Sequence, residues 1–380
     1  MSVRNSIAVS LGSAVVSMAM AASGVAVLPQ QARLVGGDTT TGDALGFSVA
    51  VSGSTAVAGA TSHAGGGAVY VFAKKGSSWH EQAQLKGSDT APGDAFGYAV
   101  AISGATVVVG APHHHWGVVT GAAYIYTASG KKWVQRLEVR SMSEGASVAA
   151  DGTTIAIGSA NASGTGIGAV DVYVQSGSTW SHQATIKSGV LNDGFGTSLG
   201  LSGNELAVGA NAGGSATGHV YVFARSGATW HRQAMLTGSD TARTDDFAQS
   251  VAINGTTIVA GSPLHANAQG AAYVFVNAKT GWSQQAKLTE ASPITGDMFG
   301  WAVGISGNEA VAGAYQRGGT GAALTFLRRG TTWSHNKTEL ATGASIGDEV
   351  GWAVAQSATT SVVGALSSGN GAGAAYVFSG

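Results

Sequence analysis

The residues best equipped for chemistry in this 380-residue chain are four consecutive side chains, His113, His114, His115 and Trp116. Histidine is a common metal ligand and titrates near neutral pH. Adjacent side chains splay in different directions, so the run by itself offers at most a loose metal site without a supporting carboxylate. We expect a solvated loop, with ligand contact as the alternative, and no metal site.

Carboxylates recur at a fixed place in the sequence and could suggest acid and base pairs. The recurring aspartates are Asp43, Asp94, Asp193, Asp245, Asp297 and Asp348, with Asp38, Asp89 and Asp240 nearby. A catalytic site is normally single, whereas these residues appear in nearly every copy of a repeat. The recurrence indicates turns that are capped by hydrogen bonds from backbone N–H groups to the side chain.

Two further patterns could carry chemistry, and each has a structural explanation. Gly196 to Gly200 spells Gly-Thr-Ser-Leu-Gly, but a nucleophile elbow needs a strand, a sharp turn and a helix, whereas Ser198 lies within a predicted strand. Six tryptophans could stack on sugars, but their register with a predicted strand favours packing over an outer sheet edge. They are Trp79, Trp133, Trp180, Trp230, Trp282 and Trp333. We find no nucleophile and base pair, and expect neither an enzyme nor a cofactor.

The elements that position these residues come from a sequence repeat that occurs in seven copies. A Gly followed by Ala or Ser closes each copy at Gly59, Gly110, Gly158, Gly209, Gly261, Gly313 and Gly364, about every 51 residues. The copies open near residues 43, 94, 142, 193, 245, 297 and 348. In the third, Met142 and Glu144 replace the opening Asp and Phe, so this copy is weak or specialised.

Each copy predicts four antiparallel strands. In the first strand Phe96, Tyr98, Val100 and Ile102 alternate with small residues, so we place them on one face of a doubly buried strand. A two-residue turn ending in Gly, such as Ser103-Gly104, leads to the second strand. The third strand reads Gly-Ala-Ala-Tyr-Val-Phe or a close variant, and the fourth follows a Ser-Gly-x-x-Trp turn. The predicted fold is an all-β, seven-bladed β-propeller of four-stranded antiparallel blades.

The ends of the chain complete the ring. The seventh copy stops after its third strand at Phe378, and Gln31 to Leu34 form a fourth strand that precedes the first copy. Pairing the two removes an exposed sheet edge. We therefore assign residues 30–380 to the propeller, whose ring is closed by the N-terminal strand.

The repeat resembles the FG-GAP repeat of integrin α-subunit head domains and of bacterial FG-GAP repeat proteins. Phe96-Gly97 and Gly110-Ala111-Pro112 carry the resemblance, which covers residues 30–380. It implies a seven-bladed propeller with roles in adhesion and in protein or glycan binding. Integrin repeats carry an Asp-rich calcium loop between the first two strands. Here a two-residue turn cannot supply the six to eight oxygen ligands of calcium.

Residues 1–29 have two interpretations. One early positive charge, a diluted apolar run from Ile7 to Met20 and the small residues Ala19 and Ala21 are typical of a secretory signal peptide. The stretch Ile7 to Val16 also resembles part of the first copy, so the segment could be a decayed repeat.

The composition narrows the range of functions that the chain could have. Charged residues make up 10%, the net charge is −1 and there is no cysteine. These values give no electrostatic case for nucleic acid or anionic membrane and exclude disulfides. No segment after the N-terminus predicts a membrane span. We expect a secreted or cell-surface monomer.

The loops between strands two and three, and between blades, vary in length and lie on one face. Variable loops on a uniform scaffold are where binding usually resides. The candidate ligand-binding residues on that face are His113, His114, His115, Trp116, Arg243, His265, Tyr315 and Arg317. We expect a binding or adhesion module for a protein or glycan. The alternatives are a lectin with sugar sites between blades and a structural surface protein without a small ligand.

Overall fold

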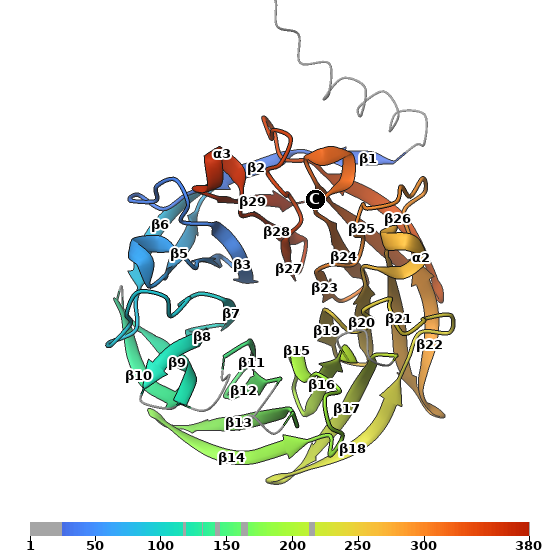
Figure 1. The fold of residues 1–380 in the computed structure, drawn as a ribbon, viewed down its shortest axis with the longest axis horizontal. Helices are drawn as coiled ribbons and strands as arrows, with labels where there is room; N and C mark the ends of the chain where they lie inside the picture. The colour runs from blue at the N-terminus through green and yellow to red at the C-terminus, as the bar shows by residue number, and fades with distance from the viewer. Residues whose placement is uncertain are drawn as a thin grey trace, which may run out of the picture.

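The computed structural model describes residues 25–116, 119–130, 132–140, 145–160, 166–212 and 217–379. Seven sheets surround a central axis, and the strands that start each repeat, β3, β7, β11, β15, β19, β23 and β27, lie innermost (Figure 1). The predicted seven-bladed propeller is confirmed.

The first four blades each contain four antiparallel strands in chain order. Blade 1 has β3 (Leu45–Ser52), β4 (Thr55–Ala60), β5 (Ala68–Lys75) and β6 (Ser78–Leu85). Blade 2 has β7 (Ala99–Ser103), β8 (Thr106–Trp116), β9 (Val119–Ser129) and β10 (Lys132–Arg140). Blade 3 has β11 (Ser147–Asp151), β12 (Thr154–Ser159), β13 (Ala169–Ser176) and β14 (Thr179–Lys187). Blade 4 has β15 (Phe195–Ser202), β16 (Glu205–Ala210), β17 (His219–Ser226) and β18 (Thr229–Leu236).

The remaining blades follow the same order, with strands from the N-terminus added to the last two. Blade 5 has β19 (Val251–Asn254), β20 (Thr257–Ser262), β21 (Ala271–Ala278) and β22 (Gly281–Leu288). Blade 6 has β23 (Val303–Ser306), β24 (Glu309–Ala314), β25 (Ala322–Arg329), β26 (Thr332–Glu339) and β1 (Ala26–Leu28). Blade 7 has β27 (Ala353–Ser357), β28 (Thr360–Ala365), β29 (Ala374–Ser379) and β2 (Gln30–Leu34).

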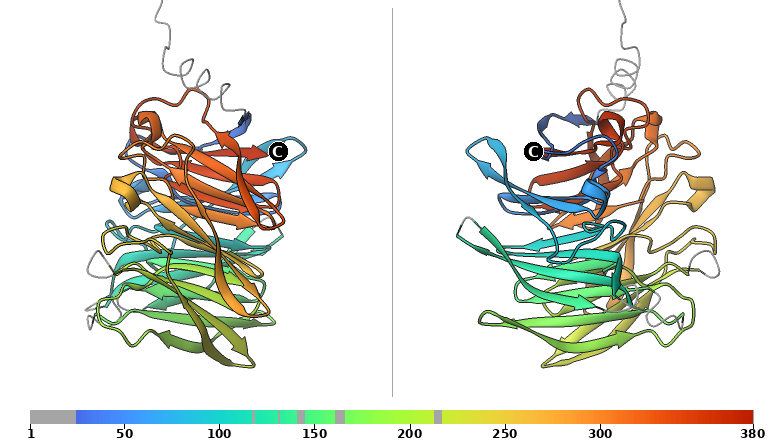
Figure 2. Two further views of the ribbon diagram at one scale, coloured as in Figure 1. Left: turned by 90° about the vertical axis from the view of Figure 1, so that its right-hand side faces the viewer. Right: turned by 60° about the vertical axis from the view of Figure 1, so that its left-hand side comes forward.

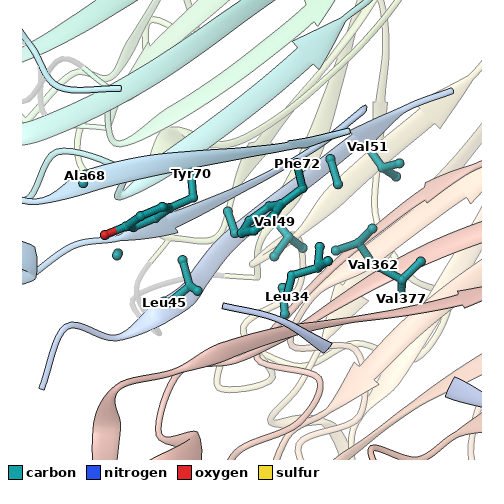
Figure 3. Close-up of a cluster of buried hydrophobic side chains, with 13 residues drawn as sticks. Leu34, Leu45, Val49, Val51, Ala68, Tyr70, Phe72, Val362 and Val377 are labelled. Atoms are coloured by element: carbon teal, nitrogen blue, oxygen red, sulfur yellow. The ribbon is translucent and has the colours of Figure 1, made fainter. Parts of the chain in front are cut away.

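The N-terminal strand closes the ring as predicted. β2 pairs antiparallel with β29, with Leu34 opposite Ala375. Leu34 also packs with side chains of blade 1, and Val362 and Val377 of blade 7 join the same buried cluster (Figure 3). Sequence-distant strands thus share one core at the junction of the first and last blades.

The end of the segment assigned to residues 1–29 also contacts the ring. β1 pairs in parallel with β26, and Leu28 is buried against blades 6 and 7. Residues 1–24, which contain the apolar run and the small residues of the predicted signal peptide, lie outside the described residues. None of the helices in the described part of the chain has the length and apolar character needed to cross a membrane.

The two faces of the ring differ. One, here the turn face, carries the turns between strands 1 and 2 and between strands 3 and 4 of each blade. The other, the variable face, carries the connections between strands 2 and 3 and those between blades. Short helical turns occur on the variable face (Figure 2), namely η1 (His63–Gly65), α2 (His265–Ala268), η4 (Arg317–Gly319) and α3 (Ser368–Gly371).

The glycine that closes each repeat is explained by packing between blades. A Cβ built on Gly110 would lie 1.9 Å from the carbonyl oxygen of Gly145 in the next blade, and one on Gly313 would lie 2.0 Å from that of Gly351. Real Cβ atoms cannot approach so closely, so only glycine fits. Gly145 and Gly351 belong to the set here called the opening glycines, namely Gly46, Gly97, Gly145, Gly196, Gly300 and Gly351, with Ala248 in their place in blade 5. The opening residue of one blade therefore docks on the closing glycine of the blade before it.

Two local predictions were wrong. In blade 2 the first strand begins at Ala99, because Ala95 and Gly97 have positive φ and the N–H of Tyr98 donates to the carbonyl of Ala95 at 3.0 Å. This turn breaks the alternation, so Phe96 is fully buried whereas Tyr98 is 37% exposed. The turns between strands 1 and 2 do have two residues, but the glycine begins the turn: Ser103 pairs with Thr106.

A ring of hydrogen bonds joins these turns on the turn face. The backbone N–H of the first turn residue donates to the side-chain oxygen that precedes the turn of the previous blade, over 2.5 to 3.3 Å. The donors are Gly53, Gly104, Gly152, Gly203, Gly255, Gly307 and Ala358, and the acceptors are Ser357, Ser52, Ser103, Asp151, Ser202, Asn254 and Ser306. All seven blade junctions carry this bond.

Candidate functional site

The mouth of the central channel on the variable face is lined by one residue from each blade. This is the residue that follows the opening glycine, or Ala248 in its place in blade 5, and the positive-φ turn directs it toward the axis instead of into the blade. In chain order the seven are Phe47, Tyr98, Ala146, Thr197, Gln249, Trp301 and Trp352. Together with Ala160 they surround a cavity of about 410 Å³, within the range of small-molecule sites.

The large residues gather on one side of this mouth and form an aromatic arc. Tyr98, Phe47, Trp352 and Trp301 are consecutive around the ring, because blade 7 adjoins blade 1. Their neighbouring ring centroids lie 5.0, 5.9 and 5.0 Å apart, distances typical of attractive aromatic pairs. Tyr315 contacts both tryptophans at 5.0 and 5.1 Å and supports the arc from behind.

The opposite side of the mouth is small and polar. It consists of Ala146, Thr197 and Gln249 from blades 3, 4 and 5. The amide of Asn211 donates to Oε1 of Gln249 at 2.8 Å, so the NH₂ group of Gln249 is the end that can donate to a ligand. None of the eight lining residues is charged at neutral pH. The cavity therefore offers aromatic faces on one side and uncharged hydrogen-bonding groups on the other.

The histidine run is not the predicted loop. His113 to Trp116 form the end of β8, which continues past Ala111 into an irregular hairpin in which His115 pairs with Thr120. The predicted splay is present: His113 and His115 are exposed, whereas His114 is buried. His113 lies 6.3 Å from the ring of Tyr98, at one end of the aromatic arc. The side chain of Trp116 lies outside the described residues.

Buried His114 belongs to an arrangement found in three blades, here called the histidine clusters. Each contains a capping Asp, a second Asp, a His, a Tyr and one residue of the fourth strand. The members are Asp43, Asp38, His63, Tyr70 and Gln84 in blade 1, Asp94, Asp89, His114, Tyr124 and Glu138 in blade 2, and Asp245, Asp240, His265, Tyr273 and Lys287 in blade 5.

The three clusters share most of their geometry. The Nδ1 of each histidine lies 2.7 to 2.9 Å from the capping Asp, and each tyrosine hydroxyl donates to the second Asp at 2.5 to 2.9 Å. Burial, reinforced by this hydrogen bond, raises the pKa of Tyr70 and of Tyr273. In blade 5 the hydrogen bond from Lys287 lowers the pKa of Asp240. In blade 2, Asp89, His114 and Glu138 together could hold a metal ion.

The other candidate residues fall in separate places on the variable face. His265 is half-buried in the blade 5 cluster, and Tyr315 is buried behind the aromatic arc. Arg317 forms an ion pair with buried Glu290, with Nε 2.5 Å from Oε2. Arg243 is exposed on the connection between blades 4 and 5. Of the candidates whose side chains the structure describes, His113 and Tyr315 adjoin the arc.

The recurring aspartates cap turns, as predicted. Oδ2 of Asp43, Asp94, Asp245, Asp297 and Asp348 accepts the N–H of the residue three positions earlier, at 2.7 to 3.0 Å. Asp193 differs and accepts the N–H of Phe195 at 3.0 Å.

Ser198 and the turn tryptophans are part of the framework between blades. The hydroxyl of Ser198 donates to the carbonyl of Ala248 in the next blade at 2.9 Å, as Ser48 does to Gly97 at 2.7 Å. All six turn tryptophans pack against buried apolar clusters, as predicted. Trp333, for example, also donates from Nε1 to Gln285 of the previous blade at 2.9 Å.

Reasoning from the sequence missed the aromatic arc. A signal was present, because the residue after the opening glycine is aromatic in blades 1, 2, 6 and 7 and small or polar in blades 3, 4 and 5. Placing that residue on the buried strand face concealed the pattern. Met142 and Glu144 of the divergent third copy lie outside the described residues, yet β11 to β14 form a complete blade.

Comparison with known proteins gives a family for the chain. The model of the FG-GAP repeat matches residues 28–72, 79–126, 230–275, 282–326 and 333–378, together more than half of the sequence. A search of curated proteins finds no significant match. The matched segments run from the fourth strand of one blade through the third strand of the next, as the ring-closing strand requires. With its seven blades and these repeats, the chain belongs to the FG-GAP repeat family.

Proposed function

We propose that this protein is a secreted or surface-displayed binding module, and that the aromatic arc holds a neutral sugar of a glycan. The observation that carries the proposal is the asymmetric channel mouth. Four aromatic side chains lie on one side, and Thr197 and Gln249 lie on the other. Sugar rings present apolar C–H faces that stack on aromatic rings, and hydroxyl groups that pair with amides and hydroxyls.

The absence of charge in the lining favours a neutral occupant over a nucleotide or an acidic peptide. A charged ligand moved into this cavity would lose hydration without gaining an ion pair. The eight lining residues include no serine, cysteine, histidine, lysine or carboxylate that could act as nucleophile or general base beside Thr197 or Tyr98, so we propose binding without turnover. The single mouth at the axis favours one site per ring over the alternative of sugar sites between blades.

The exposed side chains of His113 and His115 on β8 and the connection that carries Arg243 extend the variable face beyond the cavity. We propose that they contact the remainder of a glycan or the surface of the protein that carries it. Adhesion would follow from this contact, since the fold supplies a broad face around one anchoring pocket. The protein would act as a monomer.

A glycan array probed with the full-length protein tests the proposal. We expect saturable binding to a defined set of glycans, and at least a tenfold loss of affinity in Trp352→Ala, since aromatic anchors dominate such sites. Trp282→Ala is the matched control, because it removes an equal side chain from the outer edge of blade 5. Equal loss in both variants would contradict the assigned site. Binding to proteins alone would replace the glycan by a protein ligand, and no binding would favour the structural alternative.

A further inference from the structure

We propose that Asp89, His114 and Glu138 of blade 2 bind one divalent transition-metal ion, with Zn²⁺ the expected ion. The three side chains place one oxygen, one nitrogen and one oxygen within 4.8 Å of one another. Zinc bonds to such atoms are about 2.0 to 2.2 Å long, so two ligands of one tetrahedral ion lie roughly 3.3 to 3.6 Å apart. Small side-chain rotations would complete the site.

The first line of support is the histidine itself. His114 is only 3% exposed, and its Nδ1 lies 2.8 Å from Oδ2 of Asp94, so Nδ1 carries the proton that it donates. Its Nε2 is buried and has no hydrogen-bond partner, and it faces Oδ2 of Asp89 at 3.5 Å. In the neutral ring the lone pair of Nε2 faces this carboxylate, which is unfavourable unless a cation lies between them. A carboxylate that orients the histidine through Nδ1 is the usual outer partner of a metal-bound imidazole.

The second line of support comes from the equivalent cluster in blade 5. There Nζ of Lys287 lies 2.8 Å from Nε2 of His265 and 2.7 Å from Oδ2 of Asp240, so an ammonium group occupies the position between the ring and the second Asp. In blade 1 the amide of Gln84 takes this position, 3.2 Å from Nε2 of His63 and 3.1 Å from Asp38.

Blade 2 reverses the charge at this position. Glu138 pairs with Tyr124 across the sheet, just as Lys287 pairs with Tyr273 and Gln84 with Tyr70. A carboxylate cannot donate a hydrogen bond to Nε2. Blade 2 therefore lacks the side-chain donor that Lys287 and Gln84 supply in the other two blades, and it has an additional carboxylate at that position. In blades 1 and 5 the side chains of Gln84 and Lys287 occupy the position between the histidine and the second Asp. In blade 2 a metal ion would fit at this position.

Among the described residues, Arg140 is a charged group that already contacts this cluster. Its Nη2 lies 2.5 Å from Oδ2 of Asp89, and its Nε contacts Oε1 of Glu138. In the described part of the chain, the three carboxylates of Asp89, Asp94 and Glu138 thus face the guanidinium of Arg140 and a histidine that is neutral when it binds metal. Each carboxylate has about four lone-pair sites, so Arg140 and Tyr124 leave acceptor capacity on Asp89. Arg140 would act as an outer partner that orients both carboxylates.

The choice of zinc follows from the donor set. One imidazole and two carboxylates suit zinc, which commonly takes three protein ligands and a water. Calcium takes six to eight oxygen ligands, so we expect calcium and magnesium to bind weakly here. This proposal replaces the sequence-based expectation of no metal site, because folding supplies the supporting carboxylates that the histidine run lacked.

Isothermal titration of the metal-free, tag-free full chain with ZnCl₂ tests the proposal, and it needs no glycan. We expect one ion per chain and a rise in the unfolding temperature on binding. Glu138→Lys introduces the blade 5 arrangement and should lower zinc affinity at least 100-fold while the apo protein still folds, as judged by circular dichroism. His113→Ala and His115→Ala remove the exposed neighbours and should bind zinc like the wild type.

The reciprocal variant makes the test stricter. Lys287→Glu gives blade 5 the same three ligand types, so we expect a second zinc ion per chain. A wild-type protein that binds no zinc, or Glu138→Lys that binds it unchanged, would overturn the proposal. So would loss of the ion in His113→Ala or His115→Ala with His114 intact, which would assign the metal to the surface of the hairpin. Lys287→Glu that still binds only one ion would also count against the proposal, because the proposal assigns the difference between the two blades to the charge at this position.

Discussion

The turn face and the variable face are ends of the same strands, yet they differ in how much each blade departs from the repeat. On the turn face all seven junctions carry the same hydrogen bond from a turn N–H to the side chain of the preceding blade. On the variable face the residue after the opening glycine ranges from Ala146 to Trp352. A side chain that bonds to the next blade is constrained by the ring, whereas one that faces only the channel is free to vary.

The strongest test of this constraint is a methyl group between two blades. Gly313→Ala should lower the free energy of unfolding by about 3 kcal/mol or more, because its Cβ would lie 2.0 Å from the backbone oxygen of Gly351. Gly307→Ala is the matched control, since its Cβ would meet nothing within 4 Å and only its positive φ of 59° adds strain. Urea denaturation measures both. A smaller loss in Gly313→Ala than in Gly307→Ala would contradict the packing argument.

Glu339, which lies at a position that is apolar in the other blades, should make the stability of the fold depend on pH. Glu339 is fully buried and accepts hydrogen bonds from Thr325 and Ser361, and burial raises its pKa to about 7. The equivalent residues of the other six blades are apolar: Leu85, Val139, Ile186, Leu236, Leu288 and Leu34. Burial therefore favours the protonated form of this one side chain.

The sign of the effect follows from that pKa. The unfolded chain ionises Glu339 near pH 4.5, so its contribution to stability is complete below that pH and is lost as the pH rises through 7. The loss is about 3 kcal/mol by pH 8. Glu339→Leu should remove this dependence and unfold at a higher urea concentration than the wild type at pH 8. Glu339→Gln keeps the shape and should also flatten the profile; a profile unchanged in both variants would assign it to another group.

A smaller effect separates the two faces directly. Ser103→Ala removes one bond of the ring on the turn face, which spans 2.9 Å to the N–H of Gly152, and should cost about 1 kcal/mol of stability. Ligand binding should not change. Trp352→Ala should show the opposite pattern: ligand binding weakens, and the free energy of unfolding is affected less than binding. If Ser103→Ala weakens binding while the fold is intact, the faces are coupled and the comparison fails.

The smallest effect concerns the turn of blade 7. Ala358 takes the place of the glycine that begins this turn in the other blades, and it has a positive φ of 50°. Ala358→Gly should stabilise the fold by roughly 0.5 kcal/mol, because relief of the strained backbone outweighs the greater entropy of glycine in the unfolded chain. The control is Ala105→Gly, at a second turn position without positive φ, which should destabilise. Thermal unfolding of the two variants should therefore shift in opposite directions.

Much of the framework could be predicted because it repeats. Asp94 and its counterparts were assigned to turn caps because they recur in nearly every copy. Gln31 to Leu34 were assigned to the closing strand because the seventh copy lacks the fourth strand that the other copies have. The prediction failed where backbone conformation changes within one strand, at the turn that separates Phe96 from Tyr98. It also failed at His113 to His115, where an irregular hairpin extends a strand that the other blades end earlier. The ligand-binding roles of the candidate residues remain predictions.

The sequence by itself determined the number of blades, the order of strands and the closure of the ring, because the spacing of glycines and the missing fourth strand are properties of the chain alone. Only the tertiary structure decided which of the residues that differ from the repeat come into contact with one another. Phe47 and Trp352 lie at opposite ends of the chain, and their rings come within 5.9 Å because the ring closes. Asp89, His114 and Glu138 converge because sheet pairing and the connection between blades bring three separate segments to one point. Such contacts depend on the curvature of the ring, which no local pattern records.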